Sequence, residues 1–268
     1  MDLGLRGRTV LVTGASSGVG LATARMLLAE GAHVAACARD ADRLVGTLKE
    51  AQERAQEQRG ATGRVHAVAG DVTSRASMAS FVESTVAELG VVDAVVCNAG
   101  RSLMATIEDT SDDQVRDEFE LKIFGALNVI RAAQPHLAKS EVASVVTLNA
   151  ILARQPEPRL AVTSAARAAL LNLTRTLSHS LGAEGIRINS VLLGLIDTGQ
   201  WTRRYEAADT TQSYEEWTGE LAADRGVVLG RLGTADEVAW PIVSLLSPLS
   251  GYTTGACIDV GGGVARYV

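Results

Sequence analysis

The stretch TVLVTGASSGVG, residues 9–20, decides the fold of this chain. Its first four residues are β-branched or aliphatic and predict a buried strand, and the glycines after them form a short turn before an apolar helical pattern begins. Because glycine lacks a Cβ atom, such a turn lets backbone N–H groups approach a pyrophosphate at the positive end of the helix. Strand, glycine-rich turn and helix in this order are typical of a dinucleotide-binding Rossmann unit.

The strand signal of residues 9–12 recurs along the chain. Further short apolar runs cover residues 33–38, 64–69, 93–97, 144–148, 187–192 and 257–260. Most are continuously apolar, which is typical of parallel strands covered on both faces, and helical patterns separate them. We therefore predict an α/β protein with a three-layer Rossmann fold, built on a doubly wound parallel sheet of seven strands.

Size and charge narrow the class of protein. With 268 residues, 47% of them hydrophobic, the chain can bury the core of one large domain spanning residues 1–268. Its net charge of −6 is the wrong sign for binding a nucleic-acid backbone. The first residues resemble no secretory signal, and no apolar run is long enough to span a bilayer. We expect a cytoplasmic protein with no nucleic-acid or membrane partner.

Cysteine and histidine give no sign of a metal site. The three cysteines lie far apart in apolar, strand-like runs, so we expect buried, reduced thiols at Cys37, Cys97 and Cys257. The four histidines are scattered along the chain without the spacing of metal ligands. We therefore predict no metal in the functional site.

The spacing of Gly14, Gly18 and Gly20, written TGxxxGxG, resembles the short-chain dehydrogenase/reductase family. Asp71-Val72 and Asn98-Ala99-Gly100 resemble two further segments of that family, and the resemblance spans nearly the whole chain. It implies that the former pair holds an adenine ring and that the latter lies beside the cofactor. The implied cofactor site comprises Gly14, Ser16, Ser17, Gly18, Val19, Gly20, Arg39, Asp71, Val72, Asn98, Ala99, Gly100, Arg167 and Thr198.

The end of the second predicted strand favours NADP(H) over NAD(H). An acidic residue there would bond a ribose 2′-hydroxyl and repel a 2′-phosphate, but the position holds Ala38. The next residue is Arg39, whose planar guanidinium can pair with a phosphate through two hydrogen bonds. The alternative is that Arg39 only begins a surface turn.

The four positions that carry the chemistry of this family hold other residues here. The family uses an asparagine, a serine, a tyrosine and a lysine, and an alignment without gaps places Lys122, Ala150, Thr163 and Arg167 at those positions. An aliphatic hydroxyl is far less acidic than a phenol, so Thr163 is a poor substitute for the tyrosine as a proton donor. Arg167 keeps the positive charge of the family's lysine, so the resemblance implies that it holds the nicotinamide ribose.

Lys122 is the most informative of these substitutions, because it falls on the apolar stripe of a predicted long helix. Burial would lower the pKa of its ammonium and suit it to acid or base catalysis, or to anchoring a carbonyl group. Alternatively, it reaches out to solvent or pairs with Glu118 or Glu120. Asn149 could donate a hydrogen bond to a substrate oxygen in place of the missing serine. Our candidate catalytic residues are Lys122, Asn149, Thr163 and Arg167.

Residues 199–228 resemble the substrate loop of the family and are rich in aromatic and arginine side chains. The segment includes Trp201, Arg203, Arg204, Tyr205, Tyr214 and Trp217. This content suits a small substrate that is acidic and partly apolar, although it would also suit a contact between subunits. The last strand resembles the part of the family that packs against a symmetry mate, which implies a homodimer or homotetramer.

Three functions remain open from the sequence. The first is an NADP(H)-dependent oxidoreductase that reduces a carbonyl, or oxidises an alcohol, through a non-standard site, since the cofactor itself carries the hydride. The second is a catalytically degenerate nucleotide-binding protein or partner subunit, and the third is a lyase or isomerase without net redox chemistry. The scaffold alone does not choose among them.

Overall fold

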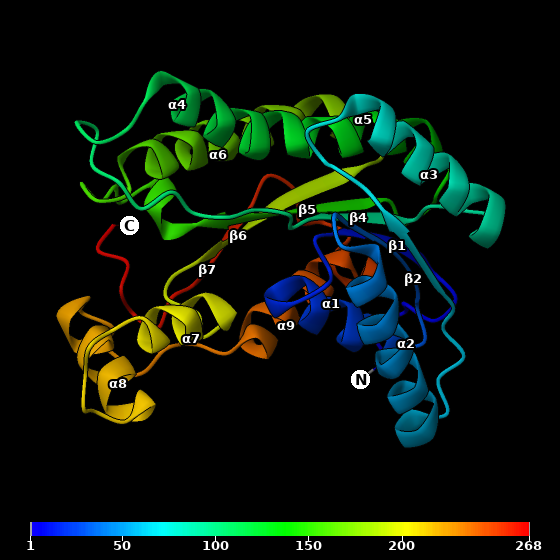
Figure 1. Ribbon diagram of the computed structural model, residues 1–268. Coiled ribbons are helices and arrows are strands. Elements are labelled where there is room, and N and C mark those ends of the chain that lie inside the picture. Colours follow the sequence, from blue (N-terminus) through cyan, green and yellow to red (C-terminus); the bar gives the residue numbers. More distant parts are fainter. Residues whose placement is uncertain (1, 268) are drawn as a thin grey trace.

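The computed structural model describes residues 2–267 and contains the predicted seven-stranded sheet (Figure 1). All strand pairs are parallel, and the strand order is β3-β2-β1-β4-β5-β6-β7. The strands are β1 Thr9–Thr13, β2 His33–Ala38, β3 Val65–Ala69, β4 Ala94–Cys97, β5 Ser144–Ala150, β6 Arg187–Leu193 and β7 Cys257–Val260. Each predicted strand therefore exists, with its ends displaced by at most two residues.

Helices cover both faces of the sheet, which confirms the predicted three layers (Figure 1). One apolar core joins the sheet to α1, α2 and α9, and a second joins its other face to α3, α5 and α6. The helices are α1 Gly18–Ala29, α2 Ala41–Arg59, α3 Arg75–Leu89, α4 Asp112–Phe119, α5 Gly125–Leu137, α6 Ala161–Gly182, α7 Gly199–Glu206, α8 Tyr214–Asp224 and α9 Ala235–Leu246. None of them, within residues 2–267, combines the length and apolar character needed to cross a membrane.

The strand order reverses between β1 and β4, and this reversal positions the site. From β1 the chain leads outward to β2 on one side, whereas β4 pairs with β1 on the other. The loops after β1 and β4 consequently leave the sheet in opposite directions and open a crevice at the carboxyl ends of the strands. Ligands of open α/β sheets bind in such a crevice.

A π-helical turn, Glu120–Phe124, interrupts the long helix predicted across Lys122. It separates α4 from α5, so the apolar stripe is not continuous α-helix as the spacing suggests. Gly125 follows the turn, and a Cβ atom there would lie 3.0 Å from Cγ2 of Val72. Such π turns occur most often at functional sites. Local periodicity could not reveal this one, because it inserts within an otherwise regular pattern.

Candidate functional site

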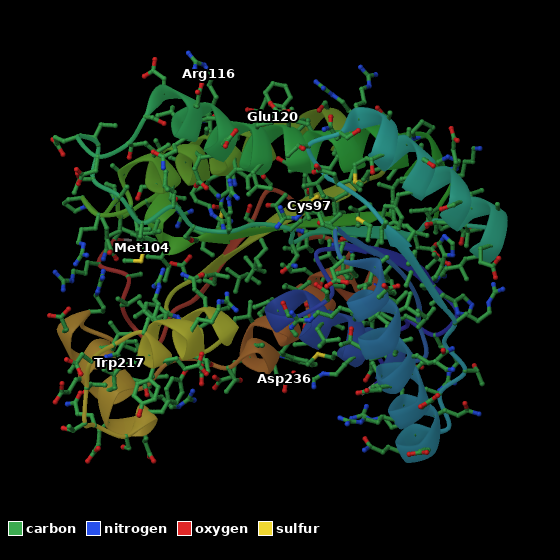
Figure 2. The ribbon with its side chains drawn as sticks, viewed as in Figure 1. Cys97, Met104, Arg116, Glu120, Trp217 and Asp236 are labelled. Atoms are coloured by element: carbon green, nitrogen blue, oxygen red, sulfur yellow. The ribbon has the colours of Figure 1, made fainter. Side chains whose placement is uncertain are left out.

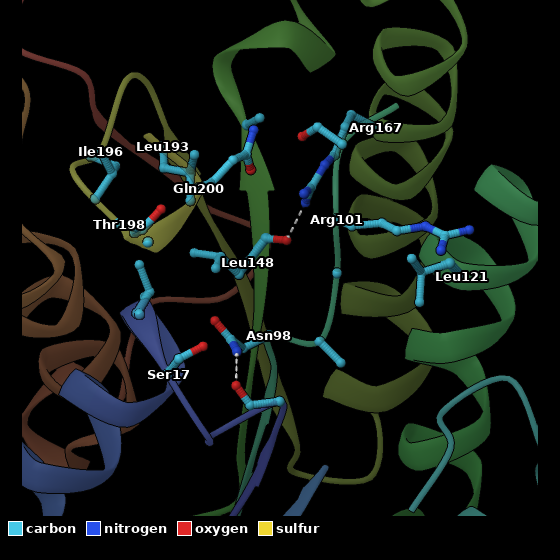
Figure 3. A pocket seen from close by; sticks show the side chains of 18 of the residues that line it. Ser17, Asn98, Arg101, Leu121, Leu148, Arg167, Leu193, Ile196, Thr198 and Gln200 are labelled. Atoms are coloured by element: carbon cyan, nitrogen blue, oxygen red, sulfur yellow. Dashed lines mark hydrogen bonds between the residues drawn. The ribbon is translucent and has the colours of Figure 1, made fainter. Parts of the chain in front are cut away.

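A cleft of about 900 Å³ lies along the carboxyl ends of the central strands (Figure 3). All but one of the predicted cofactor residues line it. The exception is Gly20, where an added Cβ would lie 2.4 Å from both the side-chain nitrogen of Asn98 and the carbonyl oxygen of Gly14. Gly20 therefore belongs to the packing beneath the turn. The sequence pattern brings the remaining predicted residues together as expected.

The glycine-rich turn presents the N-terminus of α1 to the cleft. Ser17 precedes α1 without capping it through its side chain, and Gly18 adopts a left-handed φ of 56°. The first N–H groups of a helix have no partners within the helix, and the aligned peptide dipoles make this end positive. Both Ser17 and Gly18 line the cleft, so the turn fits a pyrophosphate.

Asn98 holds this turn in place (Figure 3). Its amide nitrogen donates hydrogen bonds to the carbonyl oxygens of Thr13, at 2.9 Å, and Gly14, at 3.0 Å. In return, the Thr13 hydroxyl accepts from the backbone N–H groups of Asn98 and Ala99. The loops after β1 and β4 are thus fastened together, which fixes the geometry of the turn before any ligand binds.

Two arginines flank the end of β2, where the sequence predicts a 2′-phosphate site. Arg39 and Arg43 are both exposed and both line the cleft. The carboxylate between them, Asp40, accepts a hydrogen bond from the backbone N–H of Arg43 and caps α2. Arg43 was missed in the sequence, because only the first turn of α2 brings it beside Arg39.

Lys122 is buried in an ion pair. Its side chain and that of Glu118 are each 2% exposed, and its Nζ donates to Oε2 of Glu118 at 2.8 Å and to the carbonyl oxygen of Arg101 at 2.7 Å. Burial, followed by the charge of Arg167, lowers the pKa of Lys122 to about 8, although Glu118 opposes the shift. The lysine is therefore desolvated and paired with Glu118, and it does not reach out to solvent. The other suggested partner, Glu120, is exposed (Figure 2).

Thr163 joins the same buried cluster. Its Oγ1 lies 2.7 Å from Oε2 of Glu118 and accepts a hydrogen bond from the backbone N–H of Leu103 at 3.0 Å. The residue has no exposed surface and does not line the cleft. This candidate catalytic residue therefore lies behind the cleft wall, because α6 turns its side chain inward to the glutamate.

Asn149 likewise lies behind the cleft wall. Its side chain is fully buried, its amide nitrogen donates to the carbonyl oxygen of Arg167 at 3.1 Å, and its Oδ1 accepts from the backbone N–H of Ala150 at 2.9 Å. Both ends of the amide are thus used within the protein. Asn149 ties β5 to α6, and it does not line the cleft where a substrate oxygen would lie.

Arg167 is the candidate catalytic residue that does line the cleft (Figure 3). Its Nη1 donates to the carbonyl oxygen of Leu148 at 2.7 Å, while its Nε has no partner among residues 2–267. Burial lowers the pKa of this guanidinium to about 10, so it remains charged at neutral pH. Arg167 and Lys122 also share the wall of a void of about 10 Å³. This volume is close to that of one water-sized probe.

Arginines gather at the far end of the cleft, formed in part by α7 and α8. Arg203, Arg204 and Arg225 line it, and Arg204 lies over the ring of Trp201 at 4.5 Å. Burial and the charge of Arg225 lower the pKa of Arg204. Arg225 also pairs with Glu157. Arg225 was not among the predicted residues, because only the folding of this segment brings it back to the cleft.

Most aromatic residues of this segment pack against one another instead of lining the cleft. The rings of Tyr205 and Tyr214 are 5.2 Å apart, and Trp217 lies 5.8 Å from Tyr205 and 6.3 Å from Trp201. Figure 2 places Trp217 within this outlying pair of helices. Trp201 is the member of the cluster that reaches the cleft. The expected aromatic substrate contacts are corrected accordingly, since these side chains stabilise the segment itself.

Comparison with known proteins identifies the family. A family model described as enoyl-(acyl carrier protein) reductase matches residues 14–265. A 3-oxoacyl-(acyl-carrier-protein) reductase from Thermotoga maritima is 30% identical over 260 residues, which cover 97% of this chain and 98% of that protein.

Two solved structures resemble the fold over nearly its full length. One is an NADPH-bound short-chain oxidoreductase from Pseudomonas aeruginosa PAO1, described as containing an atypical catalytic center, with 40% identity, a TM-score of 0.90 and coverage of 97% of this chain and 98% of the other. The second is an L-sorbose reductase from Gluconobacter frateurii in complex with NADPH and L-sorbose, with 30% identity, a TM-score of 0.91 and full coverage of both chains. The chain belongs to the short-chain dehydrogenase/reductase family.

Proposed function

We propose that this protein is an NADPH-dependent reductase of a small carbonyl compound that carries an acidic group, and that its proton comes from Lys122 rather than from a tyrosine. The observation that carries the proposal is that Arg167 and Lys122 line the same small void and that Arg167 also lines the cleft. In the family, the tyrosine supplies the proton and the lysine supplies a positive charge. Here Lys122 would supply the proton and Arg167 the charge.

The cofactor is NADP(H), and the cleft fits it from end to end. The N–H groups at the start of α1 would hold the pyrophosphate, and Arg39 with Arg43 would hold the 2′-phosphate. Arg167, with its unpaired Nε, would hold the nicotinamide ribose, and Thr198 would hold the carboxamide. The cofactor-bound relatives support this assignment, because both contain NADPH.

NADPH supplies the hydride when bound. The protein must therefore orient the substrate carbonyl, stabilise the negative charge that develops on its oxygen and provide a proton to that oxygen. Arg167 brings a positive charge to the cleft wall, where it stabilises negative charge that develops on the substrate oxygen. Lys122, which also lines the void, has a pKa of about 8, so its Nζ is largely protonated at neutral pH. A water molecule in this void would accept hydrogen bonds from both cations, because neither an ammonium nor a guanidinium has an acceptor, and it would pass the lysine proton to the substrate oxygen.

The arginines at the far end favour an acidic substrate. Arg203 and Arg204 have no carboxylate partner at salt-bridge distance among residues 2–267, and Trp201 adds an apolar surface beside them. We assign residues 199–228 to substrate binding on this basis. Exposed Trp240, Leu249 and Tyr252 support the expected homodimer or homotetramer, because exposed large apolar side chains are typical of interfaces.

The test is a coupled binding and turnover experiment. NADPH and NADH are titrated by fluorescence, and NADPH oxidation is then followed with phenylglyoxylate, an acidic aromatic ketone, and with its neutral methyl ester. We expect preferential NADPH binding and oxidation that requires Lys122 but not the exposed Lys139. Tight binding without oxidation of NADPH by any carbonyl would overturn the reductase and favour the degenerate nucleotide-binding protein. Substrate conversion without oxidation would favour the lyase or isomerase.

A further inference from the structure

Glu118 occupies the centre of the altered site, although the resemblance gives this position no role. It lies on the inner face of α4, its side chain is 2% exposed, and it does not line the cleft. One carboxylate oxygen, Oε2, accepts hydrogen bonds from the Lys122 ammonium and from the Thr163 hydroxyl. The other, Oε1, is buried without a partner among the described residues.

The two groups bound to Glu118 also hold the loop between β4 and α4. Lys122 donates to the carbonyl oxygen of Arg101, and Thr163 accepts from the N–H of Leu103. Gly100, Arg101, Ser102 and Met104 of this loop line the cleft. A single buried carboxylate therefore connects α4, the π turn, α6 and one wall of the cleft.

A purely structural role would not require an ionised group at this position. A buried ion pair usually stabilises a protein no more than a well-packed apolar pair of the same size, because both charges lose their hydration. Glu118 moreover leaves Oε1 unpaired, which costs further free energy. What the carboxylate does provide is a fixed negative charge that keeps Lys122 protonated and in place.

We propose that Glu118 is a positioning residue, which holds the Lys122 ammonium beside the void shared with Arg167 and, through Thr163, fastens the cleft wall formed by Arg101 to Leu103. This inference rests on the proposed function, because it deepens the role given to Lys122. It also makes a statement about the protein without cofactor, which can be tested on its own.

The charged groups that face Lys122 set the direction of the expected change. Glu118 on α4 raises its pKa, whereas Arg167 on α6 and Arg101 in the loop lower it, and the Cys97 thiol on β4 lines the same void. Removing the negative charge of Glu118 leaves the two opposing arginines. The pKa of Lys122 should then fall by about 1–3 units, the range that an adjacent opposite charge typically provides.

The first experiment compares wild type with Glu118→Gln and with Glu53→Gln, a control at an exposed glutamate on α2. Lysine Nζ resonances are titrated by ¹⁵N NMR without cofactor, where Lys49, Lys122 and Lys139 are the only lysines of the sequence. We expect the Lys122 pKa to fall in Glu118→Gln and to remain unchanged in the control. A folded Glu118→Gln protein with an unchanged Lys122 pKa would overturn the proposal.

The second experiment tests the contact of Thr163 with Leu103 separately from the pair of Glu118 and Lys122. It also keeps the proposal testable if Glu118→Gln does not fold. Thr163→Val removes the hydroxyl that accepts the Leu103 N–H but leaves the pair of Glu118 and Lys122 intact. Hydrogen exchange should become about two- to tenfold faster at the Leu103 amide, since a lost hydrogen bond is worth about 0.5–1.5 kcal/mol. The Lys122 pKa should stay at its wild-type value.

Unchanged hydrogen exchange at the Leu103 amide would overturn the proposal that Thr163 fastens the cleft wall formed by Arg101 to Leu103. Turnover adds a third measurement, in which the alkaline limb of the NADPH oxidation rate moves to lower pH in Glu118→Gln. If the wild-type protein oxidises no NADPH, the proposed function fails. The NMR titration and the exchange rates still decide the role of Glu118, so the two failures are distinguishable.

Discussion

The two ends of the cleft follow the pattern of the family to different degrees. The proposed cofactor end has the glycine turn, the Asn98 hydrogen bonds that hold it and an arginine after β2, whereas the proposed catalytic end has Thr163 where the resemblance implies a tyrosine, and Lys122 and Thr163 lie buried against Glu118. Binding a dinucleotide depends chiefly on backbone geometry, which tolerates little change. Proton transfer depends on a few side chains, which can be exchanged when another group takes over the charge.

The sharpest way to break this comparison is Lys122→Met, which removes the ammonium and keeps a chain of similar shape. We expect kcat for phenylglyoxylate reduction to fall by about 10²–10⁴, the usual contribution of a positioned acid, while the Kd for NADPH changes little. The exposed Lys139→Met protein serves as the control. An equal loss of NADPH affinity would show that Lys122 belongs to the binding end instead.

At the cofactor end, Arg39→Ala should weaken NADPH binding by about 10- to 100-fold, because a charge-assisted hydrogen bond contributes about 1.5–3 kcal/mol. Binding of NADH, which lacks the 2′-phosphate, should be nearly unchanged. Fluorescence titration of both cofactors measures the difference. Arg54→Ala, at an exposed position further along α2, is the matched control. Equal weakening for NADPH and NADH would contradict a role in recognising the phosphate.

The pH profile sharpens the assignment of the proton. The proposed reaction requires the protonated form of Lys122, whose pKa of about 8 lies below the ordinary 10.5. Activity should therefore hold below pH 8 and fall about tenfold per unit well above it, as the ammonium loses its proton. Steady-state rates between pH 6 and 10 measure this limb. If the residual activity of Lys122→Met still falls above pH 8, the fall belongs to another titrating group.

The smallest expected effect concerns the substrate end. Arg204→Gln should raise the KM for phenylglyoxylate by about two- to fivefold, since a partly exposed ion pair contributes about 0.2–1 kcal/mol. The KM for the neutral methyl ester should not change, because the ester lacks the carboxylate. Parallel kinetics on the two compounds give the ratio. A similar rise in KM for the acid and the ester would indicate that Arg204 shapes the cleft but does not bind the carboxylate.

The sequence by itself determined the layered α/β fold, the glycine turn and the cation that follows β2. These features are encoded in short, contiguous patterns, where apolar runs and glycine spacing report local backbone conformation. They placed thirteen of the fourteen predicted cofactor residues on the cleft, with Gly20 beneath it.

Only the tertiary structure decided the catalytic end. Glu118 and Thr163 lie 45 positions apart and meet because α4 and α6 pack on the same face of the sheet. No local pattern specifies that contact, the π turn before α5, or the approach of Arg225 to the cleft. Burial and hydrogen-bond partners arise from such distant contacts, so these contacts determine that Asn149 and Thr163 face inward while Arg167 lines the cleft.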